Sequence, residues 1–157
     1  GKEFAPLRRK LNAFQKQVPD FTFKSISNFD DLWKVAYPQT QSIEDDKLWQ
    51  EQEAFEKMLV FFDQLPLKIY GIYEEKELLA FSITEKLNKA VVVIHFFKAN
   101  HAYTGLAEQL FVSIANTYMN EAENLNFQQD LGVPGLRQFK QSLRPSTMLT
   151  PRIVLPT

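Results

Sequence analysis

Three consecutive strands in the middle of the chain constrain its fold more than any other feature. Residues 67–99 read LKIYGIYEEKELLAFSITEKLNKAVVVIHFFKA, in which runs rich in β-branched and aromatic residues alternate with short polar turns. Runs of this kind, bounded by turn-forming residues, are typical of β-strands joined by tight connections. We therefore predict a three-strand meander, with its first turn at residues 74–76 and its second near residues 88–89.

The segments before the meander are mainly helical in pattern. Apolar residues recur at helical spacing within residues 4–18 and leave a basic face opposite, which predicts an amphipathic helix. Residues 21–26, FTFKSI, alternate like a strand. Residues 28–37 predict a short helix with Asn28 as its N-cap, and an acidic helix is expected from residue 42 to residue 64.

The segments after the meander alternate between helix and strand. An amphipathic helix is expected at residues 105–122 and a short strand at residues 124–127. A helix with proline in its first turn follows at residues 133–143, and a last strand at residues 147–157. Three helices and a strand, then the meander, then helix, strand, helix and strand together predict a mixed α/β fold.

Length and composition indicate one globular domain over residues 1–157. The chain has no cysteine, which excludes disulfides, thiolate zinc sites and cysteine nucleophiles. Its two histidines show no metal-ligand spacing, so we expect no metal. No stretch approaches the roughly 18 uninterrupted apolar residues that span a bilayer. The N-terminal segment lacks the apolar core of a signal peptide. We therefore expect a cytoplasmic protein, and the initial glycine suggests a fragment of a longer one.

Charge is unevenly distributed, although the net charge is only −1. Residues 1–24 carry six Lys or Arg against two acids, and residues 126–157 carry four against one. If the two ends meet in the fold, they form a basic face that attracts phosphates. The alternative is an ordinary charged surface that keeps the protein in solution.

His95 and Lys98 lie three residues apart at the end of an apolar strand. Alternation along a strand puts them on opposite faces unless a bulge intervenes. His95 is a candidate general base, and the alternative is a hydrogen-bonded, half-buried histidine. Lys98 could hold a phosphate or carboxylate, or it could be a surface lysine at the end of a strand.

A second group of candidates lies near the C-terminus. Arg137, Lys140 and Arg144 recur at helical spacing and are expected on one face of the last helix. That face could engage the phosphates of tRNA or of a lipid, or it could simply be solvated. Asp130 precedes this helix, where it could cap the helix or orient an amine.

The order of the elements resembles the acyltransferase fold often called GNAT. In that fold the pyrophosphate of coenzyme A binds at the start of the helix that follows the meander, where free N–H groups and the helix dipole favour an anion. Acetyltransferases mark the place with Arg/Gln-x-x-Gly-x-Gly/Ala. This chain has Gly105 and Ala107, but Ala102 stands at the first position, which argues against ordinary binding of coenzyme A.

Three stretches resemble a known family more specifically. Residues 91–118 are similar to the His-x-Glu-Lys-Ala-Asn/Asp…Gly segment of bacterial proteins with the phosphatidylglycerol lysyltransferase C-terminal domain. Residues 125–145, LNFQQDLGVPGLRQFKQSLRP, are similar to that family's Asn-Arg-Glu-Gln-Asp-Leu-Gly-x-x-Gly-Leu-Arg-x-x-Lys-x-Ser-Tyr-x-Pro. Residues 7–23 resemble its Lys-Arg-Asn…Phe segment, so the likeness covers nearly the whole chain.

The resemblance implies a GNAT-like fold, with a mixed and mostly antiparallel sheet flanked by helices. It implies two lobes in tandem, of which this chain is the second, with an N-terminal lobe as its partner. The related enzymes move an aminoacyl group from charged tRNA to phosphatidylglycerol or a peptide amine. Aminoacyl-tRNA would then be the donor substrate and no cofactor is needed. The matching positions are His95, Lys98, Asn100, Gly105, Asn126, Gln129, Asp130, Gly132, Gly135, Arg137 and Lys140.

Three positions depart from the family pattern. Phe97 replaces a glutamate, and Phe127 and Gln128 replace an Arg-Glu pair. A phenylalanine cannot reproduce the hydrogen bonds of a charged group, so these changes make the site drier. The chain is accordingly a divergent aminoacyl transferase or a lobe kept for structure or binding, with a coenzyme A-dependent N-acyltransferase as a further alternative.

The resemblance also suggests roles for an active protein. Asp130 would orient or deprotonate the acceptor amine, with His95 as the candidate base. Lys98 and Arg137 would neutralise phosphate or oxyanion charge. The helix start at Gly105 would offer backbone N–H groups to the donor.

Overall fold

The computed structural model describes residues 2–38, 46–130 and 132–149. Within these ranges, five strands form one sheet in the order in which they occur along the chain. They are β1 (Thr22–Ser25), β2 (Leu67–Glu74), β3 (Glu77–Lys86), β4 (Val91–Ala99) and β5 (Asn124–Asn126). Neighbours from β1 to β4 are antiparallel, and β5 is parallel to β4. The predicted meander and the mixed, mostly antiparallel sheet are confirmed.

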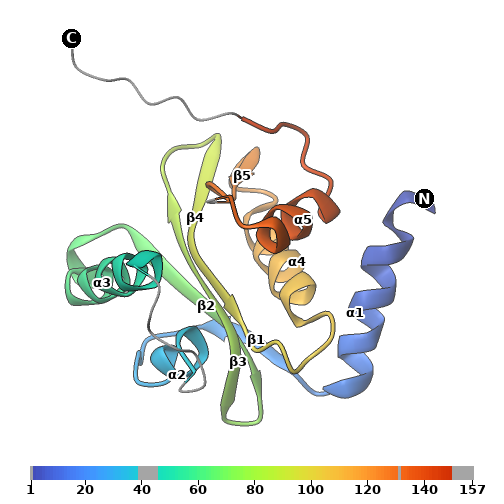
Figure 1. The fold of residues 1–157 in the computed structure, drawn as a ribbon, viewed down its shortest axis with the longest axis horizontal. Coiled ribbons are helices and arrows are strands. Elements are labelled where there is room, and N and C mark those ends of the chain that lie inside the picture. Colours follow the sequence, from blue (N-terminus) through green and yellow to red (C-terminus); the bar gives the residue numbers. More distant parts are fainter. Residues whose placement is uncertain (1, 39–45, 131, 150–157) are drawn as a thin grey trace.

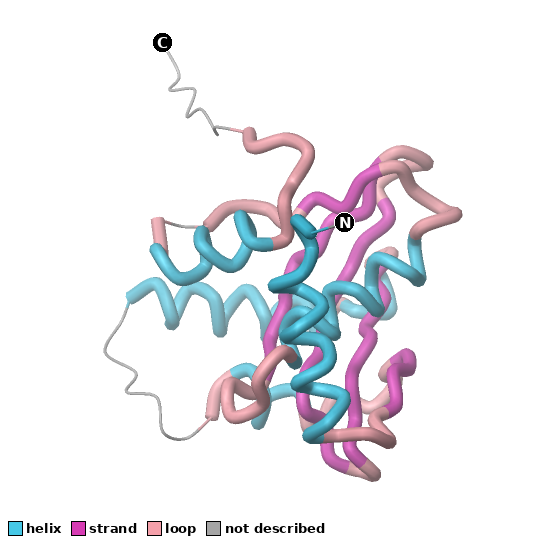
Figure 2. The backbone as a smooth tube through the Cα atoms, turned by 90° about the vertical axis from the view of Figure 1, so that its right-hand side faces the viewer, coloured by secondary structure: helices cyan, strands magenta, loops and turns pink. Residues whose placement is uncertain are grey.

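Five α-helices accompany the sheet in the described part of the chain. They are α1 (Ala5–Gln17), α2 (Leu32–Ala36), α3 (Asp46–Val60), α4 (Leu106–Tyr118) and α5 (Pro134–Ser142). Figure 1 shows α2 and α3 on one side of the sheet and α1, α4 and α5 on the other. In Figure 2, turned by 90°, α1 lies in front of the strands. The predicted arrangement of helices around a sheet is therefore present, in three layers.

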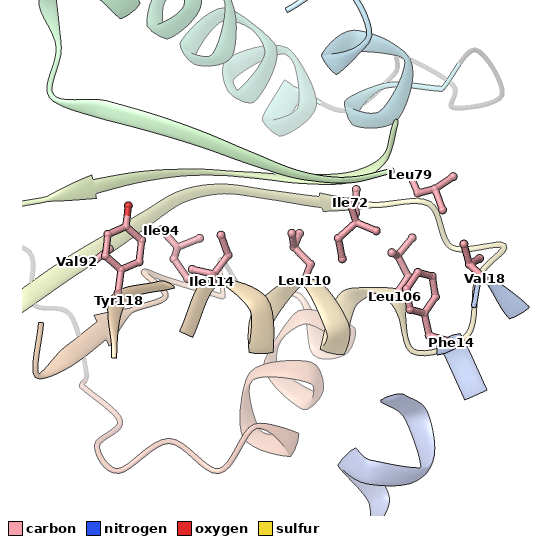
Figure 3. Packing of buried hydrophobic residues seen from close by; sticks show 11 residues of the cluster. Phe14, Val18, Ile72, Leu79, Val92, Ile94, Leu106, Leu110, Ile114 and Tyr118 are labelled. Atoms are coloured by element: carbon pink, nitrogen blue, oxygen red, sulfur yellow. The ribbon is translucent and has the colours of Figure 1, made fainter. Parts of the chain in front are cut away.

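The core between α4 and the sheet is built from the predicted apolar stripes. Phe14 and Val18, at the C-terminal end of α1, are buried against the first turn of α4 (Figure 3). On α4, the inward residues are Leu106, Leu110, Ile114 and Tyr118. Their spacing of four residues places them on one face of the helix, so the periodicity in the sequence is what fixes the orientation of α4.

A second core fills the space between the sheet and the helices α2 and α3. Phe55 of α3 is fully buried and contacts the rings of Phe81 and Phe96, with centroid distances of 5.8 and 5.0 Å. Leu32 of α2 is also fully buried. Since β3 lies between both cores, seven consecutive residues from Leu78 to Thr84 are buried.

Three expectations about element boundaries need correction or lie outside the described residues. The helix expected over residues 42–64 is α3, followed by a short 3₁₀ helix, η2 (Phe62–Gln64), and residues 42–45 are not described. Asn28 does not cap α2, because its Oδ1 accepts a hydrogen bond from the Asp30 N–H at 3.0 Å. Residues 147–149 of the expected last strand are irregular, and residues 150–157 are not described.

None of the helices in the described ranges is long and apolar enough to cross a bilayer.

Candidate functional site

Strand β4 contains a bulge at His95. On β3, Ile83 and Thr84 are adjacent, but their partners on β4 are Phe96 and Ile94, so His95 has no partner in the ladder. An extra residue of this kind interrupts the alternation of side chains along the strand. Ile94 accordingly packs into the core on the α4 side, whereas Phe96 packs into the core on the α3 side.

The bulge decides how His95 and Lys98 lie relative to each other. Lys98 contacts Glu51 of α3, and His95 contacts Glu85, which lies two residues from Ile83 on the α3 side of β3. Regular alternation would have separated the two side chains. The bulge instead brings both to the α3 side of the sheet.

His95 lies between two polar side chains. Its Nε2 is 2.7 Å from Glu85 Oε2, and its Nδ1 is 3.0 Å from Gln128 Nε2. An ionised carboxylate only accepts hydrogen bonds, so Nε2 carries the proton and Nδ1 accepts from the Gln128 amide. The side chains of His95 and Glu85 are 21% and 24% exposed. His95 is therefore hydrogen-bonded and half-buried, as the alternative to a general base expects. Its Nδ1 faces the exposed side chain of Gln128, which a ligand can displace.

Lys98 is held by a carboxylate. Its Nζ lies 2.5 Å from Glu51 Oε1, and the Tyr37 hydroxyl donates to the same oxygen at 3.0 Å. Nζ also lies 5.2 Å from the centre of the Tyr37 ring. Burial, together with the nearby Glu51 carboxylate, raises the pKa of the Tyr37 hydroxyl, which keeps it a neutral donor. An incoming anion would have to share Lys98 with Glu51.

Asp130 is paired with the arginine of the last helix. Arg137 Nε donates to Asp130 Oδ2 at 2.6 Å and Nη2 donates to Oδ1 at 3.3 Å, in the two-pronged geometry typical of such pairs. The Gly132 N–H also donates to Oδ1, at 2.9 Å. The Arg137 hydrogen bond, and then that from Gly132, lower the pKa of Asp130 to about 2. Asp130 is therefore ionised near neutral pH and closes the turn that leads into α5.

Lys140 is buried and fully used by the fold. Its Nζ donates to the carbonyl oxygens of Phe127, Gln128 and Gln129, at 2.5, 3.2 and 2.7 Å. An ammonium group has three donors, and all three are occupied. Burial lowers the pKa of Lys140. The basic face predicted for Arg137, Lys140 and Arg144 on the last helix is therefore smaller than expected, because Lys140 is turned inward. Arg144 does not belong to it either, because α5 ends at Ser142 and Arg144 has a φ of 55°.

Two of the predicted asparagines shape loops. Asn100 Oδ1 accepts from the Ala102 N–H at 3.0 Å, and Asn126 Oδ1 accepts from the Gln128 N–H at 2.9 Å. Each bond spans two residues, as in an Asx turn. The second turn fixes the backbone that presents Gln128 to His95. Gln129, next in the chain, is exposed, and its backbone oxygen is one of the acceptors of Lys140.

The start of α4 is occupied by the chain itself. Gly105 has a φ of 84°, and a Cβ atom there would lie 2.0 Å from the Lys10 backbone oxygen. Glycine is needed at this position both for its conformation and for the close approach of α1. Lys10 Nζ lies 2.5 Å from Glu108 Oε1, and Glu108 is 5% exposed in the first turn of α4. Its carboxylate supplies the negative charge that the helix start favours.

Four phenylalanines join α5 to the rest of the molecule. Phe97 of β4 and Phe127 have ring centroids 4.9 Å apart. Phe139 of α5 lies 5.9 Å from Phe97 and 6.1 Å from Phe127, and Phe111 of α4 lies 5.9 Å from Phe127. All four rings are half-buried. We call Phe97, Phe111, Phe127 and Phe139 the aromatic cluster.

One broad, open depression brings the predicted residues together. It runs around the open edge of β4 and is lined from both sides of the sheet, by residues of all five α-helices as well as β4. All nine predicted site residues are among them: His95, Lys98, Asn100, Gly105, Asn126, Gln129, Asp130, Arg137 and Lys140. Within the described ranges, no three His, Asp or Glu side chains are arranged to hold a metal ion. The surface therefore offers paired charges, one histidine and an aromatic floor.

Comparison with known protein families identifies the chain. The profile of the family described as phosphatidylglycerol lysyltransferase, C-terminal, matches residues 1–153. The chain belongs to this family. No curated protein matches the chain significantly.

Solved structures place this member of the phosphatidylglycerol lysyltransferase C-terminal family in the GNAT fold. A conserved protein of unknown function from Bacteroides thetaiotaomicron is similar over 94% of this chain and 52% of its own, with 24% identity and a TM-score of 0.79. The chain thus spans about half the length of that protein.

Two acetyltransferases share the fold at lower identity. An aminoglycoside acetyltransferase from an uncultured soil metagenomic sample has a TM-score of 0.60 at 14% identity, over 91% of this chain and 98% of its own. Ribosomal-protein-alanine N-acetyltransferase from Brucella melitensis has a TM-score of 0.61 at 11% identity, over 87% and 99%. These two likenesses establish the fold of the lysyltransferase family chain and nothing about its substrate.

The three departures from the lysyltransferase family pattern lie together in space. Phe97 contacts Phe127 in the aromatic cluster, and Gln128 contacts His95. At each of the three positions where the resemblance expects a charged residue, the side chain present here contacts another residue of this chain. The substitutions are therefore mutually compatible in the fold.

Sequence reasoning missed the residues that partner the candidates. Glu85 and Glu51 reach His95 and Lys98 from β3 and α3, and Lys10 reaches the start of α4 from α1. Each partner is distant in the chain and ordinary in type. No signal in the sequence pointed to Glu85, because it is the next-to-last residue of a strand that also contains Ser82, Thr84 and Lys86.

Proposed function

We propose that this domain is a transferase lobe that moves an aminoacyl group from the ester of charged tRNA to an amine or hydroxyl acceptor. Membership of the phosphatidylglycerol lysyltransferase C-terminal family supports a reaction of this class. The acceptor would be an anionic lipid head group or a peptide amine. The protein would act in the cytoplasm beside a companion lobe, which is consistent with its spanning 52% of the Bacteroides protein.

The single observation that favours tRNA over coenzyme A is the state of the α4 start. In acetyltransferases of this fold, that helix start receives the pyrophosphate of coenzyme A. Here the Lys10 backbone oxygen approaches Gly105, and the Glu108 carboxylate is buried one turn along. A pyrophosphate would find α1 in its way, and the charge at the helix start is already supplied by Glu108, which is paired with Lys10, so a donor that binds elsewhere is favoured.

A row of cations on α1 supports a polyanionic donor. Lys2 of the preceding 3₁₀ helix η1 (Lys2–Phe4) and Arg9 and Lys16 of α1 are exposed and seven residues apart, and we call them the α1 cation row. Arg9 and Lys16 lie on the side of α1 opposite its buried stripe. Seven residues are two turns of an α-helix, so Arg9 and Lys16 are about 10 Å apart along α1. None of the three has an ion-pair partner among the residues that the structure describes. Such a row can follow a phosphate backbone.

The chemistry we propose uses His95 as the proton acceptor. The amine or hydroxyl of the acceptor attacks the carbonyl carbon of the aminoacyl ester and gives its proton to His95 Nδ1. The new C–N or C–O bond forms, the ester bond to the tRNA ribose breaks, and the proton passes from His95 to the departing ribose oxygen. His95 is left neutral, ready for another cycle.

The charged residues would bind and orient in this scheme. A carboxyl with a pKa of about 2 is a poor base near neutral pH, so Asp130 fits the role of orienting an amine better than that of deprotonating it. Lys98 and Arg137 would neutralise phosphate or oxyanion charge, each by sharing its present partner, Glu51 or Asp130.

The test is fluorescence anisotropy of a labelled, charged tRNA minihelix with this chain, at several salt concentrations and with acetyl-coenzyme A as competitor. The proposal expects salt-sensitive binding that Lys98→Gln and Arg137→Gln weaken and that acetyl-coenzyme A does not displace. Displacement by acetyl-coenzyme A would contradict it and indicate an ordinary acyltransferase. Absence of binding at low salt, also with the companion lobe present, would contradict it too.

A second candidate function is a lobe that binds or supports without chemistry. The aromatic cluster favours it, because Phe97 and Phe127 occupy positions where the resemblance expects charges. Lys140 favours it as well, since its three donors serve the fold. Under this candidate neither donor binds, and His95→Gln leaves every property of the full-length protein unchanged.

A further inference from the structure

Glu85 holds the one side of His95 that faces into the sheet. Its Oε2 lies 2.7 Å from His95 Nε2, and about three quarters of each side chain is covered, with 24% and 21% exposed. A hydrogen bond to a carboxylate at this distance, largely shielded from water, fixes both the rotation of the ring and the nitrogen that bears the proton. The contact joins β3 and β4 at the position where the ladder has its bulge.

The opposite side of the ring faces the open edge of β4. Strand β5 pairs with β4 only at residues 91–93, so His95 lies two residues beyond the last paired position. There Nδ1 meets the amide of Gln128, an exposed residue with a φ of 50° that follows the end of β5. Both residues line the depression described above.

We propose that Glu85 is a positioning residue: its hydrogen bond with Nε2 fixes the His95 ring so that Nδ1 is directed at the open edge of β4. The orientation follows from the geometry alone. Its catalytic consequence rests on the proposed function, in which Nδ1 takes the proton of the attacking amine or hydroxyl.

The arrangement gives each group a defined task. Once Nδ1 has taken the proton, the ring is a cation, and the Glu85 carboxylate beside Nε2 stabilises that charge. The Gln128 amide donates to Nδ1 in the same way as an acceptor's N–H or O–H would. Gln128 is therefore the group that an acceptor displaces, whereas Glu85 stays in place throughout the reaction.

Nuclear magnetic resonance of the imidazole nitrogens tests the orientation without any substrate. The chain has two histidines, so His101→Gln assigns the signals of His95. At pH 8 we expect a protonated Nε2 whose hydrogen is shifted downfield and exchanges slowly, because it is held by the Glu85 carboxylate. Glu85→Ala should abolish that hydrogen signal. Gln128→Asn, which shortens the amide and tolerates a positive φ, should retain it.

Two results would overturn the inference: absence of the Nε2 hydrogen signal in the unmodified chain, or its persistence in Glu85→Ala. Glu85→Gln provides a second variant of equal size should the alanine variant fold poorly. In Glu85→Gln the signal should move upfield, because a neutral amide oxygen is a weaker acceptor than a carboxylate.

Transfer kinetics test the consequence. We expect Glu85→Gln to lower kcat at least 10-fold and to leave KM nearly unchanged. The loss should not exceed the roughly 10²–10⁴-fold that a general base contributes as a whole. Glu85→Asp should restore part of the rate, and Glu75→Gln, an exposed carboxylate in the β2–β3 turn, should have no effect. Unchanged kcat in Glu85→Gln would overturn the positioning role. If the Nε2 hydrogen signals behave as expected but neither the unmodified chain nor any variant catalyses transfer, the proposed function is contradicted and the orientation of His95 is not.

Discussion

At the scale of single residues, Lys140 differs most from its sequence prediction. The sequence predicts a surface cation on the last helix, whereas in the structure Lys140 is buried and bonded to backbone carbonyl groups. It neutralises the partial charges of three consecutive carbonyl groups that no strand partner reaches. Its Nζ also lies over the ring of Phe127 in the aromatic cluster, 5.1 Å from the ring centre. The backbone that carries Gln128 toward His95 therefore depends on a residue of α5.

Replacing Lys140 should destabilise the fold. Lys140→Met keeps the length of the side chain but leaves the carbonyl groups without donors, and we expect a loss of about 2 kcal/mol in the free energy of unfolding. Urea unfolding followed by circular dichroism measures it. Gln138→Met, at an exposed position of the same helix, is the control and should stay within about 0.5 kcal/mol. Equal stability of both variants would contradict the internal role of Lys140.

Asp130 predicts a pH dependence with a defined sign. Its pKa is about 2 in the folded chain and 3.8 ordinarily, so folding favours the ionised carboxyl. The resulting stabilisation is fully present above about pH 5 and is lost as the pH falls toward 2. We expect the stability difference between the unmodified chain and Asp130→Asn to shrink over that window. A difference that stays constant from pH 5 to pH 2.5, measured by thermal unfolding, would contradict the Asp130–Arg137 pair.

At the scale of elements, the contact between α1 and α4 decides what the start of α4 can do. Tight packing at Gly105 turns a position that resembles an anion site into a helix crossing. The aromatic cluster decides the position of α5. This helix is attached to the rest of the molecule by the ring of Phe139 and by the hydrogen bonds of Lys140.

Glycine substitutions test whether the α1–α4 contact requires a glycine at residue 105. Gly105→Ala combines a positive φ with a clash against the Lys10 backbone, so we expect a loss of at least about 2 kcal/mol in the free energy of unfolding. Gly135→Ala is the matched control, since a Cβ atom there meets nothing within 4 Å and the position is helical. It should be neutral or stabilise by up to about 1 kcal/mol. Similar effects at both positions in chemical unfolding would contradict the packing role.

The Phe97–Phe127 contact can be examined by a double-mutant cycle. Phe97→Glu alone should destabilise, because it puts a carboxylate beside a half-buried ring, and Phe127→Arg alone should do so as well. In the double variant the two charges can pair, so we expect a favourable coupling of about 1 kcal/mol. Urea unfolding of the four proteins gives this value. Strict additivity would show that the two positions are not in contact.

At the scale of the whole molecule, the sheet separates two polar regions. Lys98, Glu51 and Tyr37 lie on the α3 side, and the exposed α1 cation row belongs to the opposite side, where Figure 1 shows α1. His95 stands at the β4 edge between them.

The α1 row predicts a salt dependence for polyanion binding. Changing Lys2, Arg9 and Lys16 to glutamine should reduce the slope of log K against log salt by about 2, since each neutralised phosphate contributes roughly 0.7–0.9. The control changes Lys57, Lys68 and Lys89, which are exposed and remote from α1, to glutamine. It alters net charge equally. Equal slopes for the two triple variants would indicate that overall charge, and not the α1 row, attracts the minihelix.

The sequence by itself determined the elements and their order. Periodicity of apolar residues predicts α1, α4 and the meander, because burial of one face imposes a period of 3.6 in a helix and of 2 in a strand. The motif resemblance correctly indicated the family and the GNAT fold. Asn28 was misread as a cap because local hydrogen bonding can satisfy the same side chain in a turn.

Only the tertiary structure decided what the candidate residues touch. The bulge at His95, the Glu85 carboxylate beyond it and the three carbonyls around Lys140 arise from contacts between distant segments. Such contacts have no local periodicity, since they depend on register and on how closely two elements approach. The sequence thus determined which residues are presented at the β4 edge. The packing of α1, α3 and α5 around them decided which are already paired and which remain open to a ligand.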